Sequence, residues 1–116
     1  MNILIVINDP PYGTERCYNA LRLAGSLAKR DGTAVRVFLM ADAVGCAAAG
    51  QQTPNGYYNL ERMLKGLVRH GGEVACCGTC MDARALADEQ LVEGARRSTL
   101  EELADWTLWA SKVLTF

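Results

Sequence analysis

Three of the five cysteines in this 116-residue chain lie in one short segment, Cys76-Cys77-Gly78-Thr79-Cys80. The segment follows an apolar run and precedes a helical pattern, so Cys77 is expected just past the end of a strand, where a helix begins. Backbone amides of residues 79–81 and the helix dipole would stabilise a thiolate there, lowering its pKa below the ordinary value of about 8.5. Gly78 would allow close backbone approach, and Cys80 is near enough to act as a resolving thiol or acceptor. The segment predicts thiol chemistry on Cys77.

The other cysteines, Cys17, Cys46 and Cys76, are expected to be small buried residues, because unpaired cysteine is commonly buried. An odd number of cysteines rules out complete intramolecular pairing, and no export signal is visible. A reducing cytoplasm is therefore expected, where cysteines are more often catalytic, metal-binding or buried than disulfide-bonded. Zinc needs four ligands. The one set available is Cys76, Cys77, Cys80 and His70. No second paired motif supports it, so we predict no metal site and no cofactor.

Composition favours a single globular domain over residues 1–116. Twelve basic and thirteen acidic residues give a net charge of −1, and no Lys/Arg block stands out, which argues against nucleic-acid binding. The apolar start, Ile3 to Ile7, is too short to span a membrane and lacks the basic segment that precedes a signal peptide core. We expect neither nucleic acid nor membrane as a partner.

Strand-like and helical patterns alternate along the chain. The predicted strands are Asn2–Asn8, Thr33–Met40, Glu73–Cys76, Ala95–Ser98 and Lys112–Phe116. The predicted helices are Thr14–Arg30, a short one within Ala43–Ala49, one from Leu60 to Gly71-Gly72, Asp82–Leu91, and one opened by a capping box in 98–102 that runs to Ser111. This alternation predicts an α/β fold, a flavodoxin-like three-layer sandwich with a five-stranded, mostly parallel sheet in the order 2-1-3-4-5.

The end of the chain predicts self-association. Flavodoxin-like folds usually add a final helix, whereas this sequence stops on a predicted strand, which would leave part of one sheet face uncovered. The preceding helix has apolar residues on more than one side, including Leu103, Trp106, Leu108 and Trp109. We therefore expect a homo-oligomer.

Other uses of a Cys-x-x-Cys or of this fold class fit less well. A thioredoxin-like site needs a proline downstream of the motif, but Pro10, Pro11 and Pro54 all lie upstream. A flavodoxin phosphate loop would follow the first strand, where this chain carries Asp9 and Glu15. A phosphate-accepting receiver domain would end the third strand in Asp rather than Cys.

Several segments together carry a resemblance to a known family. They are Asn8-Asp9-Pro10, Phe38 to Val44, Gly56-Tyr57-Tyr58, Cys77-Gly78-Thr79-Cys80-Met81-Asp82-Ala83-Arg84, and the ending Leu103 to Thr107 with Lys112 to Phe116. With these segments the chain resembles the DsrE/DsrF/TusD-like (YchN-like) sulfur-relay proteins over nearly its full length. The resemblance implies a flavodoxin-like subunit that forms trimers or hexamers. It also implies a cysteine after the third strand that accepts sulfur as a persulfide and passes it to another protein.

The position matching that cysteine is Cys77, counted back from Arg84. In the family Arg84 is usually followed by Gly, and this chain has Ala85 instead, which would alter the local backbone but not the thiol chemistry. Arg84 would either favour an anionic sulfur electrostatically or lie on a solvated helix face.

Three functions remain open on this basis. The leading hypothesis is a sulfur carrier or sulfurtransferase-like protein with a persulfide on Cys77, serving donor and acceptor proteins; whether it is an enzyme stays open. The second is a non-catalytic oligomeric module that binds a ligand or partner at the loop of residues 42–58. The third is a thiol redox sensor that cycles Cys77 and Cys80.

Overall fold

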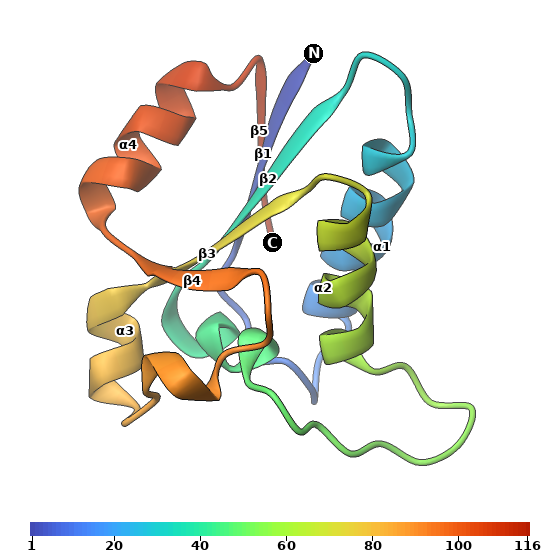
Figure 1. Cartoon of the computed structure of the whole chain (residues 1–116), viewed down its shortest axis with the longest axis vertical. Helices are drawn as coiled ribbons and strands as arrows, with labels where there is room; N and C mark the ends of the chain where they lie inside the picture. The colour runs from blue at the N-terminus through green and yellow to red at the C-terminus, as the bar shows by residue number, and fades with distance from the viewer.

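A computed structural model describes all residues, 1–116, and shows five parallel strands between two helical layers (Figure 1). The strands are β1 (Asn2–Ile7), β2 (Ala34–Leu39), β3 (Glu73–Cys77), β4 (Ala95–Ser98) and β5 (Lys112–Thr115). The helices are α1 (Arg16–Ala28), α2 (Leu60–Arg69), α3 (Gly78–Ala83) and α4 (Leu100–Trp109), with 3₁₀ turns η1 (Ala41–Ala47) and η2 (Asp88–Gln90). The predicted fold class is confirmed.

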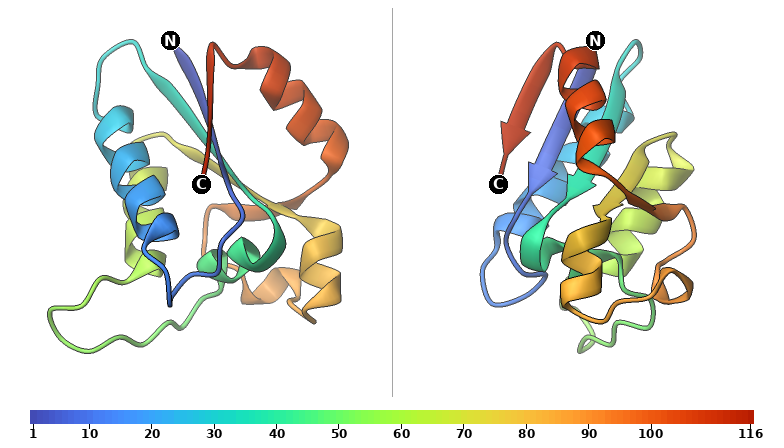
Figure 2. Two further views of the ribbon diagram at one scale, coloured as in Figure 1. Left: turned by 180° about the vertical axis from the view of Figure 1, so that it is seen from behind. Right: turned by 90° about the vertical axis from the view of Figure 1, so that its left-hand side faces the viewer.

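The central strands β1 and β2 are buried on both faces, which explains their nearly continuous apolar sequences. In β1, Ile3 and Ile5 point into a cluster of 21 buried residues, while Leu4 points into a smaller cluster of five on the opposite face. β5 lies at the outer edge of the sheet beside β1 (Figure 2), and its Val113 is exposed.

Helices α1 and α2 cover the face with the larger cluster. Their buried positions, among them Ala20, Leu21 and Ala24 in α1 and Leu64 in α2, recur at helical spacing. The side chain of Asn59 caps α2 by accepting a hydrogen bond from the Arg62 N–H at 3.1 Å. None of the helices combines the length and the apolar character needed to cross a membrane.

Helix α4 alone covers the other face. It begins at a Thr99 cap, whose hydroxyl accepts a hydrogen bond from the Glu102 N–H at 3.2 Å. Its Trp106 packs edge-on against Phe38 of β2 at a centroid distance of 6.0 Å. On the outer side of the helix, Leu100 is 67% exposed and Leu108 is 87% exposed. This layer therefore has one helix where the other layer has two, which makes it the thinner layer, and it exposes apolar side chains to solvent.

The strand order is β4-β3-β2-β1-β5, so the predicted order 2-1-3-4-5 is wrong. Strand β2 pairs with both β1 and β3. Successive strands β1 to β4 step across the sheet in one direction, and the chain then returns to the far side of β1. Because crossovers are right-handed, the return through α4 lies on the opposite face from α1 and α2.

This order places a crevice between β3 and β4. The connection that leaves β3 enters α3, whose Met81 joins the larger cluster, whereas the connection that leaves β4 enters α4 on the other face. Ligand sites in open α/β sheets form where neighbouring strands send their connections to opposite faces, at the carboxyl ends of the strands. In the predicted order the crevice would have lain between β1 and β3.

The predicted helix Asp82–Leu91 is also wrong. Helix α3 starts earlier, at Gly78, and ends at Ala83. Ala85 follows with a φ of 52°, a left-handed conformation that an α-helix cannot accommodate. Only the short turn η2 lies in the rest of that segment.

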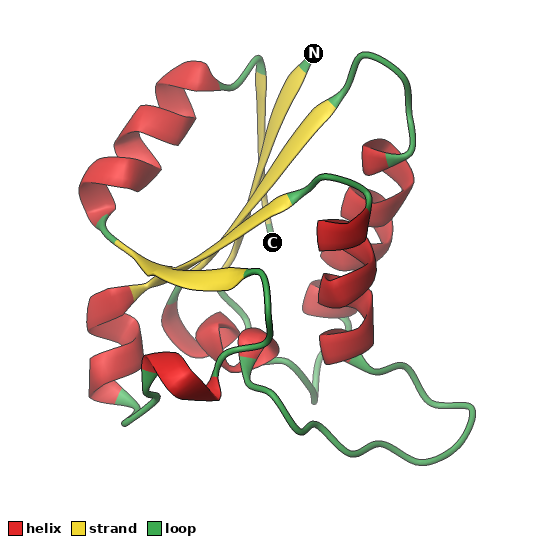
Figure 3. Cartoon of the chain, viewed as in Figure 1, coloured by secondary structure: helices red, strands yellow, loops and turns green.

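The long loop between η1 and α2 (green in Figure 3) is fastened by stacked tyrosines. Tyr58 stacks on Tyr18 of α1 at a centroid distance of 4.3 Å and on Tyr57 at 4.4 Å. Tyr12 stacks on Tyr58 at 5.7 Å, and its hydroxyl accepts a hydrogen bond from the Leu60 N–H. All four tyrosines of the chain thus join this loop to the first helix and the loop before it.

Candidate functional site

A cavity of about 600 Å³ opens at the carboxyl ends of β3 and β4, at the crevice that the strand order creates. Its lining comes from five elements, β2, β3, α3, β4 and α4, and the residues beside them: Phe38, Met40, Cys77, Gly78, Thr79, Cys80, Asp82, Arg97, Ser98, Thr99, Leu100 and Glu101. Four of the five predicted site residues are among them. The fifth, Arg84, is not.

Cys77 is the last residue of β3 and the cap residue of α3. In register it pairs with Ser98 of β4. Because side chains alternate along a strand, the preceding Cys76 points into the larger core while Cys77 faces the cavity, half-buried. Cys77 therefore lies where the sequence predicted it, at the junction of the third strand and the following helix.

The pKa of the Cys77 thiol is lowered. Partial burial is the largest influence and acts to raise the pKa, but hydrogen bonds from the Thr79 hydroxyl and the Cys80 thiol, with smaller contributions from the backbone N–H groups of Cys80 and Thr79, outweigh it. The Cys77 Sγ lies 3.3 Å from the Thr79 Oγ1. These donors favour the thiolate, which is the nucleophilic form of cysteine.

Cys80 has the opposite character. Burial and the neighbouring Cys77 sulfur raise its pKa, so its sulfur stays protonated when Cys77 ionises. The backbone N–H of Ala41, the first residue of η1, donates a hydrogen bond to the Cys80 Sγ at 3.2 Å. Ala41 itself has a φ of 50°. The motif thus contains one activated thiol and one proton-bearing thiol.

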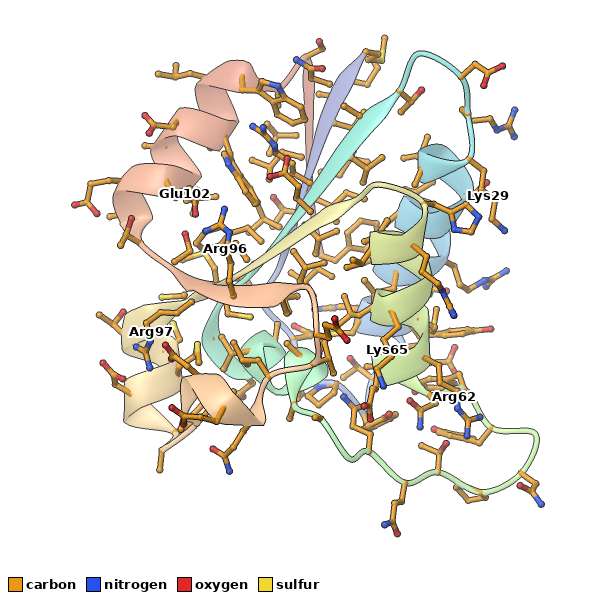
Figure 4. The ribbon with its side chains drawn as sticks, in the orientation of Figure 1. Lys29, Arg62, Lys65, Arg96, Arg97 and Glu102 are labelled. Atoms are coloured by element: carbon orange, nitrogen blue, oxygen red, sulfur yellow. The ribbon has the colours of Figure 1, made fainter.

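Gly78 permits the close approach expected of it. A Cβ atom at this position would lie 3.0 Å from the Ser98 carbonyl oxygen and 3.1 Å from two side-chain atoms of Arg97. Arg97 donates a hydrogen bond to the Gly78 carbonyl at 3.0 Å and pairs with Asp82 at 2.9 Å and Asp88 at 2.6 Å. In Figure 4, Arg97 of β4 lies over α3, whereas Arg96 lies toward Glu102 of α4. Strand β4 and helix α3 are thereby fixed to each other across the floor of the cavity.

Arg84 lies behind the site, on the side of η1. Its Nε and Nη2 donate to the Asp42 Oδ1 at 2.9 and 2.8 Å, and its Nη1 donates to the Cys80 carbonyl at 3.0 Å. The guanidinium is therefore neutralised by Asp42 and joined to the backbone of α3. Two alternatives were open for Arg84 from the sequence, an electrostatic partner of the sulfur or a solvated residue, and the geometry adds this third arrangement.

The three remaining cysteines are completely buried. Burial raises the pKa of Cys76 to about 12. The Cys46 thiol donates to the Cys17 sulfur, which lowers the pKa of Cys17 and raises that of Cys46. The Cys17 thiol in turn donates to the Asp9 carbonyl at 2.8 Å. None of these sulfurs is accessible to a reagent in the folded chain.

The four zinc ligands considered from the sequence do not come together. No group of three or more His, Cys, Asp or Glu side chains is arranged to hold a metal ion. His70 ends α2, where its Nδ1 donates to the Gly66 carbonyl at 2.8 Å. The loop of residues 42–58, proposed above as an alternative binding site, lines none of the three cavities of the structure.

Sequence reasoning missed the outer wall of the cavity and the support behind Cys80. The predicted order already placed the fourth strand beside the third, and the predicted capping box marked Ser98 to Glu101 along the chain. Neither showed that the chain leaves β4 toward the face opposite the one that Met81 of α3 enters, which makes these residues a wall of the cavity. No local pattern indicated the roles of Ala41 and Asp42 at the site, because these roles arise only when η1 packs against α3.

The DsrE/DsrF-like family matches the chain over residues 1–116. The chain belongs to this family. The resemblance found in the sequence is thereby confirmed. Protein YchN of Escherichia coli K12 is 44% identical over 115 residues, which cover 98% of this chain and 97% of YchN. An uncharacterized protein of Methanocaldococcus jannaschii is 36% identical over 116 residues and covers both chains completely.

Solved structures agree with this assignment. The crystal structure of YchN from E. coli superposes with a TM-score of 0.94 at 44% identity and covers 100% of this chain and 99% of that chain. A protein of unknown function from Methanobacterium thermoautotrophicum shares the fold, with a TM-score of 0.77 at 12% identity over 99% of this chain and 98% of that chain. The φ of 52° at Ala85 is a conformation that glycine adopts freely, which gives a physical reason for the glycine that the resemblance led us to expect there.

Proposed function

We propose that this DsrE/DsrF-like protein is a sulfur carrier that holds a persulfide on Cys77. The observation that carries the proposal is that Cys77 alone among the five cysteines combines a lowered pKa with a place on the wall of a cavity. Cys17 also has a lowered pKa but is completely buried, and Cys80 is accessible but has a raised pKa. A carrier needs one accessible thiolate, and Cys77 meets that requirement.

The chemistry needs no change in overall oxidation state. The Cys77 thiolate attacks the outer sulfur of a donor persulfide; the sulfur–sulfur bond of the donor breaks, a new one forms to Cys77, and the donor leaves as a thiolate that takes up a proton. In the second transfer a thiolate of the acceptor attacks the outer sulfur on Cys77. Cys77 then leaves as the thiolate, which the hydrogen bonds from Thr79 and Cys80 stabilise.

The shape of the cavity suits a persulfide. Phe38 and Met40 supply an apolar wall, whereas Thr79 supplies a hydroxyl group 3.3 Å from the Cys77 sulfur. An apolar wall limits access of water to a reactive intermediate. A volume of about 600 Å³ also exceeds what one extra sulfur atom requires, so a cysteine side chain of a donor or acceptor has room to enter.

The partners we propose are other copies of the chain and proteins that give and receive sulfur. Leu100 and Leu108 on the outer side of α4 and Val113 on the edge strand β5 are exposed apolar residues on the thinner layer. A homotrimer or homohexamer that buries them would bring a neighbouring subunit close to the cavity rim at Leu100. The replacement Leu108→Glu should shift the mass measured by light scattering toward the 12.6 kDa monomer. A parent protein that is already monomeric would contradict the self-association.

A thiol that must stay reduced also favours the cytoplasm as the compartment.

Mass spectrometry after incubation with a persulfide donor tests the carrier function. We expect the mass of one additional sulfur atom on the peptide that contains Cys77, absent in Cys77→Ser and retained in the matched variant Cys80→Ser. The result that overturns the proposal is sulfur on a different cysteine, or no stable sulfur on the folded protein at any donor concentration that leaves it folded.

A second candidate, a dithiol redox function, is favoured by the Cys80 thiol lying beside the Cys77 sulfur. In this reaction the Cys77 thiolate attacks a disulfide oxidant such as oxidised glutathione and releases one thiolate. Cys80, after losing its proton, attacks the mixed disulfide and releases the second. Treatment with oxidised glutathione should then give a Cys77–Cys80 bond detectable in peptide maps. A stable glutathione adduct on Cys77 would speak against this function.

A further inference from the structure

A closed ring of contacts surrounds Cys80. Its sulfur accepts a hydrogen bond from the Ala41 N–H, and its carbonyl oxygen accepts one from the Arg84 Nη1. Arg84 also bonds the carboxylate of Asp42 through two nitrogens. Because Asp42 directly follows Ala41 in the chain, the ring closes through the backbone. Cys80 is thus held at both its sulfur and its carbonyl by one unit.

The ring joins two elements that also share the larger core cluster, and it contains the one ion pair between them. Ala41 and Asp42 begin η1, which follows β2, whereas Cys80 and Arg84 belong to α3 and its end, which follow β3. The start of η1 is also held by the hydrogen bond from the Met40 N–H to the Ile7 carbonyl and by the buried Ala43, and the Arg84–Asp42 pair adds a direct link from Asp42 to the end of α3. An ion pair that touches neither sulfur is thus joined, through the backbone of Ala41, to the contact that holds the Cys80 thiol.

The charged groups near the two sulfurs come from every element around them. Asp82 of α3, Arg97 of β4 and Glu101 of α4 line the cavity, and Arg97 is paired with Asp82. On the opposite side, Arg84 is paired with Asp42. Neither arginine is an unpaired cation beside the Cys77 sulfur, so hydrogen bonds from Thr79 and Cys80 remain the main stabilisers of the thiolate.

We propose that Asp42 and Arg84 are positioning residues, which act through Ala41 to hold the Cys80 thiol as the hydrogen-bond donor to Cys77. The proposal rests on Cys77 as the reactive thiol of the proposed function, and it concerns how that thiol is activated. It gives Arg84 a mechanical role in place of the two alternatives stated from the sequence, and it assigns a role to Asp42 that the sequence did not indicate.

The test is the rate at which iodoacetamide alkylates Cys77, followed by mass spectrometry across a range of pH. Arg84→Met should slow alkylation near neutral pH by about fivefold and move the midpoint of the pH profile upward, because one hydrogen bond to the thiolate is lost. Asp42→Asn should act in the same direction to a smaller extent. Lys65→Met, which removes a surface ion pair with Glu61 on α2, is the matched control and should change nothing at Cys77.

The Cys80→Ala background decides between the two roles of Arg84. If Arg84 acts through Cys80, adding Arg84→Met to Cys80→Ala should leave the Cys77 profile as it is in Cys80→Ala alone. An equal slowing in both backgrounds would show a direct electrostatic effect and overturn the proposal, as would an unchanged profile in Arg84→Met. The assay measures thiol reactivity without any sulfur donor, so it holds even if the protein proves not to carry persulfide. Should Arg84→Met fail to fold, Asp42→Asn in both backgrounds gives the same comparison.

Discussion

Replacing Gly78 by alanine tests how tightly β4 and α3 approach each other at the floor of the cavity. The added Cβ would lie 3.0 Å from the Ser98 carbonyl oxygen and 3.1 Å from the Cγ and Nη1 of Arg97. The carbonyl belongs to a strand paired with β3, and Arg97 is fixed by two carboxylates. Neither neighbour can yield without disturbing the contacts of the site.

Two effects of opposite sign decide the outcome. Alanine is favoured over glycine in a helix by about 0.5–1 kcal/mol. Forcing an extra carbon into a well-packed region costs about 1–3 kcal/mol. We therefore expect Gly78→Ala to lower the free energy of unfolding by about 0–2.5 kcal/mol, the difference between those ranges. Gly66→Ala in α2, where a Cβ would meet nothing within 4 Å, should instead raise it by about 0.5–1 kcal/mol.

Urea denaturation followed by circular dichroism measures both variants under the same conditions. The slope of the transition should stay constant, so that the shift in midpoint reports stability. As a second readout, Cys77 in Gly78→Ala should be alkylated at a changed rate, while in Gly66→Ala its rate should match the parent. If Gly78→Ala proves as stable as Gly66→Ala, the close approach at Gly78 is not a constraint and the reasoning is refuted.

Three further outcomes follow from the thiols and the backbone. Cys77 should be alkylated fastest of the five cysteines, with a midpoint below the ordinary thiol pKa because its own pKa is lowered; faster reaction of Cys17 or Cys46 in the folded protein would contradict this. Because burial raises the pKa of Cys76 to about 12, the folded state keeps a proton that the unfolded chain loses above about pH 8.5. The free energy of unfolding should fall as pH rises through that window, and in urea titrations Cys76→Ala should reduce the slope by about 1.4 kcal/mol per pH unit. Ala85→Gly should stabilise the protein by about 1 kcal/mol, because Ala85 occupies a left-handed conformation that glycine adopts freely, and a lower urea midpoint would exclude this.

Local patterns located most of the secondary structure. The five strands and the helices α1, α2 and α4 lie within a few residues of their predicted bounds, because each carries a clear apolar period or a cap, as at Asn59 and Thr99. The helix predicted after Cys80 was wrong because the left-handed backbone of Ala85 ends the helix inside a segment of helical composition. No side-chain pattern records that backbone conformation. The predicted strand order was wrong for a related reason. The alternation of strands and helices fits both the predicted and the observed order, and the pairing of strands depends on contacts between residues far apart in the chain.

The candidate site was predictable only where its residues are adjacent in sequence. Cys77, Gly78, Thr79 and Cys80 form one continuous segment at a strand–helix junction, and the structure brings all four to the cavity. The function of Arg84 could not be read from its spacing, because its partner Asp42 belongs to a segment 42 residues away along the chain.

The separation of the aromatic residues gives the molecule two optical reporters. All four tyrosines stack where the long loop meets α1, whereas Trp106 and Trp109 lie at α4, with the Arg36 guanidinium 5.1 and 3.9 Å from their ring centroids. Tryptophan fluorescence therefore observes the layer that flanks the Cys77 cavity, and tyrosine absorbance observes the opposite layer. A ligand, a neighbouring subunit or a sulfur donor that engages one face would change one signal and leave the other untouched, so the unlabelled protein can report which of its faces is in contact.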